Sequence, residues 1–179
     1  MRVIAGTLKG RRLKAPTWDG LRPTSDKLRE TLFNILAPRI EGARVLDGYA
    51  GTGAVGIEAL SRGAAHVTFI DDDRRAQALI ADNLAHCGVA DGYVMIRAGV
   101  ARALADLRGA SFDIMVFDPP YNQQPDAILA AAADRLAPGG VLVLEHARRD
   151  RAPESAGRLV RTRDVTSGDS ALSFYSWPL

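Results

Sequence analysis

Three carboxylates each follow a short apolar run of the kind that forms buried strands: Asp47, Asp71 and Asp118. In an open α/β sheet, a ligand binds in the crevice beyond the carboxyl ends of the parallel strands. We therefore expect these side chains to line one crevice and to act on a ligand held there.

A glycine turn follows the first of these carboxylates. Gly51, Gly53 and Gly56 have the G-x-G-x-x-G spacing of dinucleotide-binding turns, although that spacing alone is a weak indication. A pyrophosphate needs backbone N–H groups and the positive end of a helix, and the Asp47 carboxylate would repel it. A ligand with an ammonium and a sulfonium group, such as S-adenosylmethionine, would be attracted instead. A plain strand-to-helix connector without a ligand is the alternative.

Asp71 lies 24 positions after Asp47, at the expected end of the second strand. A carboxylate about 20 residues beyond such a turn accepts hydrogen bonds from ribose hydroxyls in nucleotide-binding folds. The position indicates an adenosine-containing ligand without choosing between cofactors. Asp72 is the alternative in register, and a solvated acidic turn is the alternative without a ligand.

The sequence Asp118-Pro119-Pro120-Tyr121 gives the most specific indication of chemistry. Two prolines fix the backbone and remove two N–H donors, so the Asp118 carboxylate and the Pro119 carbonyl can both accept from one exocyclic NH₂ group. These bonds aim the amine lone pair at a methyl group, and Tyr121 offers a face on which a base stacks. A base inside folded nucleic acid must first be unstacked. A rigid strand-ending turn with an exposed tyrosine is the alternative.

Strands and helices alternate from residue 44 onward. Strands are expected at 44–47, 67–70, 93–97, 113–117 and 141–145, and helices near 54–62, 74–87, 100–107 and 126–136. This alternation predicts a Rossmann-like α/β fold with a mostly parallel, doubly wound sheet. Segments 158–164 and 171–177 predict a C-terminal antiparallel hairpin.

The beginning of the chain has a different pattern. Residues 2–14 predict a small β-hairpin, and a helix capped by Thr24 or Ser25 is expected to end at Pro38. We therefore expect an N-terminal extension over residues 1–40 and the main domain over residues 41–179.

Composition restricts the class of protein. A chain of 179 residues with 47% hydrophobic and 25% charged residues is typical of one globular domain. No apolar run approaches the roughly 20 residues of a membrane span, and no signal peptide is evident, so we expect a cytoplasmic protein that contacts no membrane. Cys87 is the only cysteine, which excludes an internal disulfide. The three histidines are widely separated, so no metal site is predicted. No interface stripe is evident, and a monomer is expected.

Charge is distributed unevenly along the chain. Residues 1–29 hold eight Lys and Arg against two Asp, a net charge of +6, whereas the whole chain has a net charge of +2. Such asymmetry indicates a contact with a polyanion, and a solvated basic face explains it equally well.

Several motifs, taken together, resemble a known family. They include Arg2-Val3-Ile4-Ala5-Gly6, Lys9-Gly10-Arg11-Arg12-Leu13, Arg22-Pro23-Thr24, Gly56-Ile57-Glu58-Ala59-Leu60-Ser61-Arg62-Gly63-Ala64, Asp118-Pro119-Pro120-Tyr121 and Leu172-Ser173-Phe174-Tyr175. Over nearly its whole length the chain resembles class I S-adenosylmethionine-dependent methyltransferases. More narrowly, it resembles the RsmD family, which methylates guanine N2 in small-subunit (16S) ribosomal RNA.

The resemblance implies a role for each matching position. The cofactor would be S-adenosylmethionine, bound by Asp47, Gly51, Gly53, Asp71, Asp72 and Val100. The target base would be held by the catalytic group of Asp118, Pro119 and Tyr121. The RNA partner, in the assembling or assembled small ribosomal subunit, would be gripped by Lys9, Arg11, Arg12, Lys14 and Arg22.

Two positions depart from the family pattern. Gly48-Tyr49 replaces two larger apolar residues, which is expected to loosen the turn, and Gly99 stands near the place of an acidic residue that would reach the adenine. Neither change removes a reacting group. Adenine N6 methylation of DNA or RNA stays open as a second activity, as does a non-catalytic RNA-binding or assembly factor with the same fold.

Overall fold

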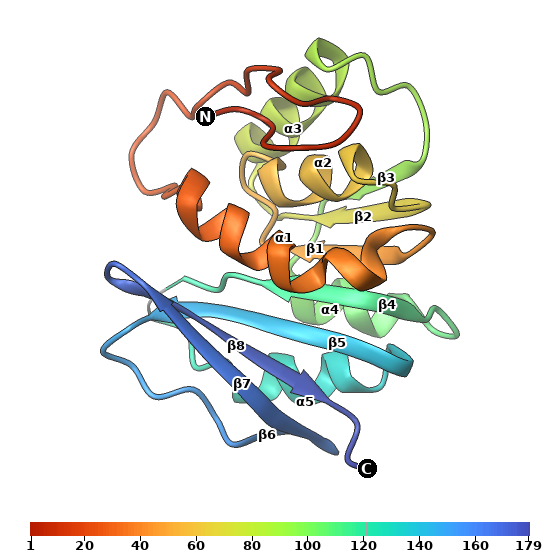
Figure 1. Cartoon of the computed structure of the whole chain (residues 1–179), viewed down its shortest axis with the longest axis vertical. Helices are drawn as coiled ribbons and strands as arrows, with labels where there is room; N and C mark the ends of the chain where they lie inside the picture. Colours follow the sequence, from red (N-terminus) through yellow and green to blue (C-terminus); the bar gives the residue numbers. More distant parts are fainter. Residues whose placement is uncertain (121) are drawn as a thin grey trace.

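The computed structural model describes residues 1–120 and 122–179. Five helices and eight strands follow one another along this part of the chain (Figure 1): α1 (Asp26–Ile40), β1 (Arg44–Gly48), α2 (Ala54–Ser61), β2 (His66–Ile70), α3 (Arg74–His86), β3 (Tyr93–Ile96), α4 (Val100–Asp106), β4 (Phe112–Phe117), α5 (Asp126–Ala133), β5 (Leu136–Ala147), β6 (Ser155–Ala156), β7 (Leu159–Ser167) and β8 (Ser170–Ser176).

One sheet contains all eight strands, in the order β3-β2-β1-β4-β5-β8-β7-β6. The first five strands pair in parallel, and β8, β7 and β6 add an antiparallel edge. The predicted α/β fold with a C-terminal hairpin is therefore confirmed. From β1 the chain adds β2 and β3 on one side and then β4 and β5 on the other. The strand order therefore reverses at β1, and ligands bind beyond the carboxyl ends of the strands at such a point.

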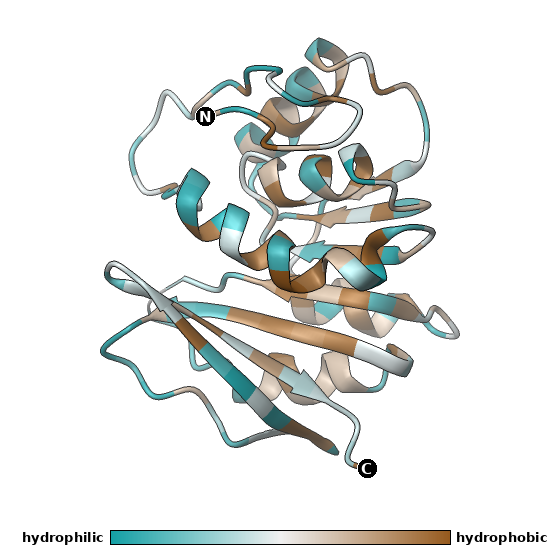
Figure 2. Cartoon of the chain, in the orientation of Figure 1, coloured by the Kyte–Doolittle hydropathy of each residue, from teal (hydrophilic) through white to brown (hydrophobic). Residues whose placement is uncertain are grey.

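Helices cover both faces of the sheet. One apolar core lies between the sheet and α1, α2 and α3, and a second lies between the sheet and α4 and α5. Hydrophobic residues concentrate along the central strands, whereas β7 is largely hydrophilic (Figure 2). The pattern is expected because helices cover both faces of the central parallel strands, whereas strands near the edge of the sheet are exposed.

The N-terminal segment forms less regular structure than predicted. A single bridge, Arg2 with Arg12, replaces the expected hairpin of two strands. Two backbone bonds flank the bridge, from the Val3 N–H to the Arg11 carbonyl (2.9 Å) and from the Leu13 N–H to the Met1 carbonyl (3.0 Å). The segment instead finds its partners on α2, where the Glu58 carboxylate accepts from the N–H groups of Ile4 (2.8 Å) and Ala5 (3.0 Å).

The predicted boundary between α5 and β5 was wrong. The helix was expected to reach residue 136 and the strand to begin at residue 141, but α5 ends at Ala133 and β5 begins at Leu136. The Pro138-Gly139-Gly140 sequence lies inside β5 because pairing with β4 shifts register between Phe112 and Ile114, which absorbs the extra residues as a bulge.

Two further boundaries differ by shorter distances. The helix α1 continues through Pro38 to Ile40, and the terminal hairpin turns over two residues, Gly168 and Asp169, because Ser167 pairs with Ser170. Among the described residues, no helix has the length and apolar character that crossing a membrane requires.

Candidate active site

A cavity of about 1170 Å³ opens at the carboxyl ends of β1, β2, β4 and β5. Its walls come from the loop before α1, the turns after these strands, and the tip of the β7–β8 hairpin. Figure 1 shows the loop that leads into α1 and the hairpin tip at the same end of the strands. The position agrees with the crevice predicted from the sequence.

The glycine turn between β1 and α2 has the backbone conformation that glycine favours. Gly51 and Gly53 have φ angles of 60° and 80°, and Gly53 stands at the N-terminal cap of α2. A side chain at Gly56 would collide with the Phe69 ring, so this third glycine lets α2 pack closely on β2.

The departure at Gly48-Tyr49 does not leave the turn loose. The Phe117 ring fills the space beside Gly48, where a Cβ atom would lie 2.5 Å from it. The Tyr49 ring packs edge-on against Phe117, and its hydroxyl donates to Oε1 of Gln123 (3.0 Å). Tyr49 therefore connects the turn after β1 to the loop after β4.

Asp71 braces the same turn. Its carboxylate accepts from the Gly51 N–H (2.9 Å) and from the Asp73 N–H (2.9 Å). Burial raises the pKa of Asp71, and these backbone bonds oppose the rise. A carboxylate has about four acceptor positions, so Asp71 keeps capacity for ribose hydroxyls, and the more exposed Asp72 lies beside it at the cavity wall.

Three carboxylates from three neighbouring strands line the cavity, and we call Asp47, Asp118 and Glu145 the acidic floor. Asp47 is buried and accepts from the Gly56 N–H (3.0 Å), and burial raises its pKa well above the usual value. Burial, followed by the negative charges of Glu145 and Asp47, raises the pKa of Asp118 to about 8. Burial also raises the pKa of Glu145, against the effect of a hydrogen bond from Thr24.

Exposed basic side chains also line the cavity, and we call Arg22, Lys27, Arg149 and Arg151 the basic mouth. They come from the loop before α1, the first turn of α1, and the loop after β5. The arrangement attracts a cationic group to the acidic floor and a polyanionic chain to the basic mouth.

A smaller pocket of about 210 Å³ adjoins the cavity. Its wall includes Asp71, Asp72 and Val100, together with the apolar side chains of Ala98 and Ile128. Val100 begins α4 directly after Gly99, so the wall at this point consists of backbone and small apolar groups. Within residues 1–120 and 122–179, no group of three or more His, Cys, Asp or Glu side chains is placed to hold a metal ion.

Comparison with known proteins identifies the family. A family profile described as conserved hypothetical protein 95 matches residues 1–176. YlbH of Bacillus subtilis (strain 168), whose name marks it as a candidate rRNA methyltransferase, is 40% identical over 180 residues that cover 98% of each chain. The chain belongs to the RsmD family of S-adenosylmethionine-dependent rRNA methyltransferases.

Further relatives of this RsmD-family chain agree. Ribosomal RNA small subunit methyltransferase D of Escherichia coli (strain K12) is 43% identical over 123 residues, which span 69% of this chain and 61% of that protein. The structure of yhhF from Escherichia coli, described as a candidate methyltransferase, matches with a TM-score of 0.87 at 32% identity, covering 98% of this chain and 96% of that one.

The RsmD family uses S-adenosylmethionine, and the described residues fit it. The acidic floor complements a ligand that carries both a sulfonium and an ammonium group. The braced carboxylate of Asp71 suits a ribose, and the apolar wall beside Val100 suits the flat face of an adenine. The individual cofactor roles of Asp47, Gly51, Gly53, Asp71, Asp72 and Val100 stay predictions.

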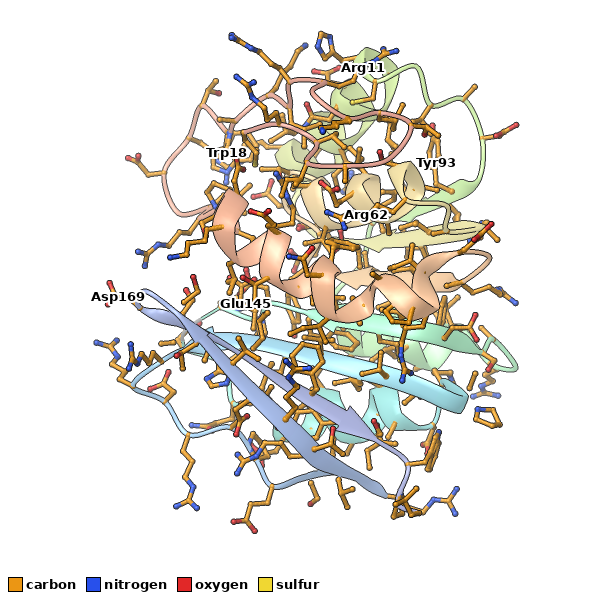
Figure 3. The ribbon with its side chains drawn as sticks, viewed as in Figure 1. Arg11, Trp18, Arg62, Tyr93, Glu145 and Asp169 are labelled. Carbon is orange, nitrogen blue, oxygen red and sulfur yellow. The ribbon has the colours of Figure 1, made fainter. Side chains whose placement is uncertain are left out.

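The structure separates the basic residues that the sequence grouped together. Arg22 lines the cavity. The other four do not line the cavity. Lys14 lies on α3, where its N–H donates to Oδ1 of Asn83 and its Nζ lies 3.9 Å from Asp82. Figure 3 shows Arg11 near α3 and far from Glu145. Contact with RNA through Lys9, Arg11, Arg12 and Lys14 stays a prediction.

The predicted base-binding group is described in part. Asp118 and Pro119 line the cavity directly after β4, and Tyr121 lies outside the described residues. Sequence reasoning missed Glu145 and the basic residues Lys27, Arg149 and Arg151. A signal for Glu145 was present, since it ends the fifth predicted strand as the three other carboxylates end theirs.

Proposed function

We propose that this chain transfers a methyl group from S-adenosylmethionine to the exocyclic N2 of one guanine in small-subunit (16S) rRNA, of the guanine-966 type. The observation that carries the proposal is the position of Asp118 and Pro119, which directly follow β4 and line the same cavity as the glycine turn and Asp71. The name of the Escherichia coli relative supports the small-subunit target.

The described residues account for the chemistry of such a transfer. Asp118 and the Pro119 carbonyl accept from the two N–H groups of the guanine N2, so its lone pair points at the methyl carbon. The N–C bond forms as the S–C bond breaks, and one proton leaves the amine for Asp118 or water. Bound S-adenosylmethionine supplies the electrophilic methyl group, and the protein contributes position and acceptors.

Labelled S-adenosylmethionine and small ribosomal subunits that lack their native methylation test the proposal. We expect a single N2-methylguanine after nuclease digestion and mass spectrometry. Detection of N6-methyladenine in RNA or DNA instead would show adenine methylation and reject the proposal. RNA binding without label on any substrate would indicate a non-catalytic assembly factor.

The variant Asp118→Ala tests the role of this carboxylate. Transfer should be lost while S-adenosylmethionine binding, measured by calorimetry, is still detected. Turnover like that of the unmodified protein would reject the proposed role of Asp118.

A further inference from the structure

Glu145 lies beside Asp118 at the same level of the sheet. The strands β4 and β5 pair in parallel with Phe117 opposite Leu144, so Asp118 and Glu145 are the next residues along neighbouring strands. Neighbouring strands are about 4.8 Å apart.

The two side chains also share one face of the sheet. Side chains alternate between faces along a strand. Phe117 and Leu144 belong to the core under α4 and α5, whereas Val116 and Val143 belong to the core under α1, α2 and α3. Asp118 and Glu145 therefore both project toward the face that α1, α2 and α3 cover, and both line the cavity.

Thr24 holds the Glu145 carboxylate in place. The Thr24 hydroxyl donates to Oε2 of Glu145 at 2.8 Å, across 121 positions of sequence. One hydrogen bond uses one of about four acceptor positions on a carboxylate, so Glu145 keeps capacity to accept from a ligand. In the view of Figure 3, Glu145 lies between α1 and the hairpin whose tip carries Asp169.

The Watson–Crick edge of guanine suits two adjacent carboxylates. It presents the N2 amino group and, directly next to it, the N1–H donor. Adenine presents an amino group next to N1, which is an acceptor and would meet a carboxylate with repulsion. A site that hydrogen-bonds its substrate discriminates strongly against an analogue that lacks the bonding group, because the buried polar group of the protein is then left unpaired. A purely apolar pocket discriminates far less.

We propose that Glu145 accepts the N1–H of the target guanine while Asp118 and Pro119 hold N2, so that Glu145 determines the choice of guanine over adenine. The inference rests on the proposed guanine N2 activity. Glu145 would then select the base, and the hydrogen bond from Thr24 would orient the Glu145 carboxylate.

A base analogue separates this role from a structural one. 2-Aminopurine keeps the amine at position 2 but has an acceptor at N1, so the small-subunit RNA is prepared with either guanine or 2-aminopurine at the labelled nucleotide. For the unmodified protein we expect kcat/KM on guanine to exceed that on 2-aminopurine at least tenfold. In Glu145→Gln, transfer to guanine should fall about 10- to 100-fold, and the 2-aminopurine to guanine ratio should rise about tenfold, because an amide can donate to N1.

Two further variants serve as controls. Thr24→Val removes the hydrogen bond that orients Glu145 but leaves its charge, so it should shift the ratio in the same direction as Glu145→Gln, by a smaller factor. Asp91→Asn removes an exposed charge from the loop between α3 and β3, away from the cavity, and should change neither rate. An unchanged ratio in Glu145→Gln, with both rates lowered equally or neither lowered, would overturn the inference. Absence of label on guanine with the unmodified protein would instead reject the underlying guanine activity.

Discussion

The proposed role of Asp118 requires an ionised carboxylate in an environment that disfavours the charge. Asp118 must be ionised to accept hydrogen bonds from an amine, yet burial and the charges of Glu145 and Asp47 raise its pKa to about 8. Carboxylates with such perturbed pKa values concentrate at functional sites. The acidic floor therefore favours a bound cation or N–H donor, either of which relieves the repulsion.

The pH dependence of methyl transfer should reflect this pKa. We expect kcat/KM to rise with pH and to fall about tenfold per pH unit below the pKa of Asp118, which is about 8. In Glu145→Gln the acidic limb should move to lower pH, because one of the two neighbouring charges is gone. A profile that is flat between pH 6 and pH 8 would contradict an ionised Asp118 as the acceptor.

Removing the Asp118 charge should stabilise the fold. A carboxyl with its folded pKa raised from 3.8 to about 8 loses stability as pH rises through that interval, because the folded state retains a proton that the unfolded chain releases. Asp118→Asn should therefore raise Tm at pH 8, by about 2–4 °C for each kcal/mol relieved. The difference in Tm should vanish toward pH 4, and thermal unfolding across this range measures it.

At the scale of elements, a buried ion pair attaches the N-terminal segment to the main domain. Arg29 on α1 is fully buried, 3.8 Å from the Glu58 carboxylate on α2, and it also contacts Asp26 (3.0 Å). Glu58 in turn accepts from the backbone of Ile4 and from Arg62 (2.8 Å). Residues of the first forty therefore share a core and a polar network with α2.

Loss of Glu58 should be costly because it leaves the buried Arg29 with less compensation. Glu58→Ala should lower the free energy of unfolding by about 3–5 kcal/mol. Glu30→Ala, an exposed change on α1, is the matched control and should stay within about 0.5 kcal/mol. Chemical denaturation of both variants gives the comparison, and equal midpoints would contradict a stabilising role for this network.

For the molecule as a whole, acidic and basic side chains meet in one cavity. The acidic floor and the basic mouth line it together, so one site offers acceptors to a cationic methyl donor and positive charge to RNA phosphates. Phosphate contacts of this kind make RNA affinity dependent on salt.

The double variant Arg149→Ala/Arg151→Ala should weaken RNA binding and reduce the slope of log K against log salt by up to about 1.4, at about 0.7 for each phosphate of single-stranded RNA. Arg102→Ala on α4, where Arg102 lies 3.7 Å from Asp106, should leave the slope unchanged. Binding titrations at several salt concentrations measure both. The same titration on Arg11→Ala/Arg12→Ala tests the predicted RNA contact of the N-terminal segment.

The sequence by itself determined the parallel α/β order and the three carboxylates Asp47, Asp71 and Asp118 at strand ends. These features follow from local periodicity and from the rule that parallel strands end at one edge, so they need no knowledge of packing. Ser25 as the cap of α1 was also predictable, because capping involves only neighbouring residues: its side chain accepts from the Leu28 N–H at 3.1 Å.

Only the tertiary structure decided what stands beside each of these residues. Thr24 was an equally good cap by type, but it reaches Glu145 on β5 instead. The bulge that extends β5 through Pro138-Gly139-Gly140 depends on register with β4, and most of the basic N-terminal residues turned away from the cavity because their segment packs on α2 and α3. These features depend on strand register and on contacts between residues more than 50 positions apart. Neither produces a periodic pattern from which the sequence could predict it.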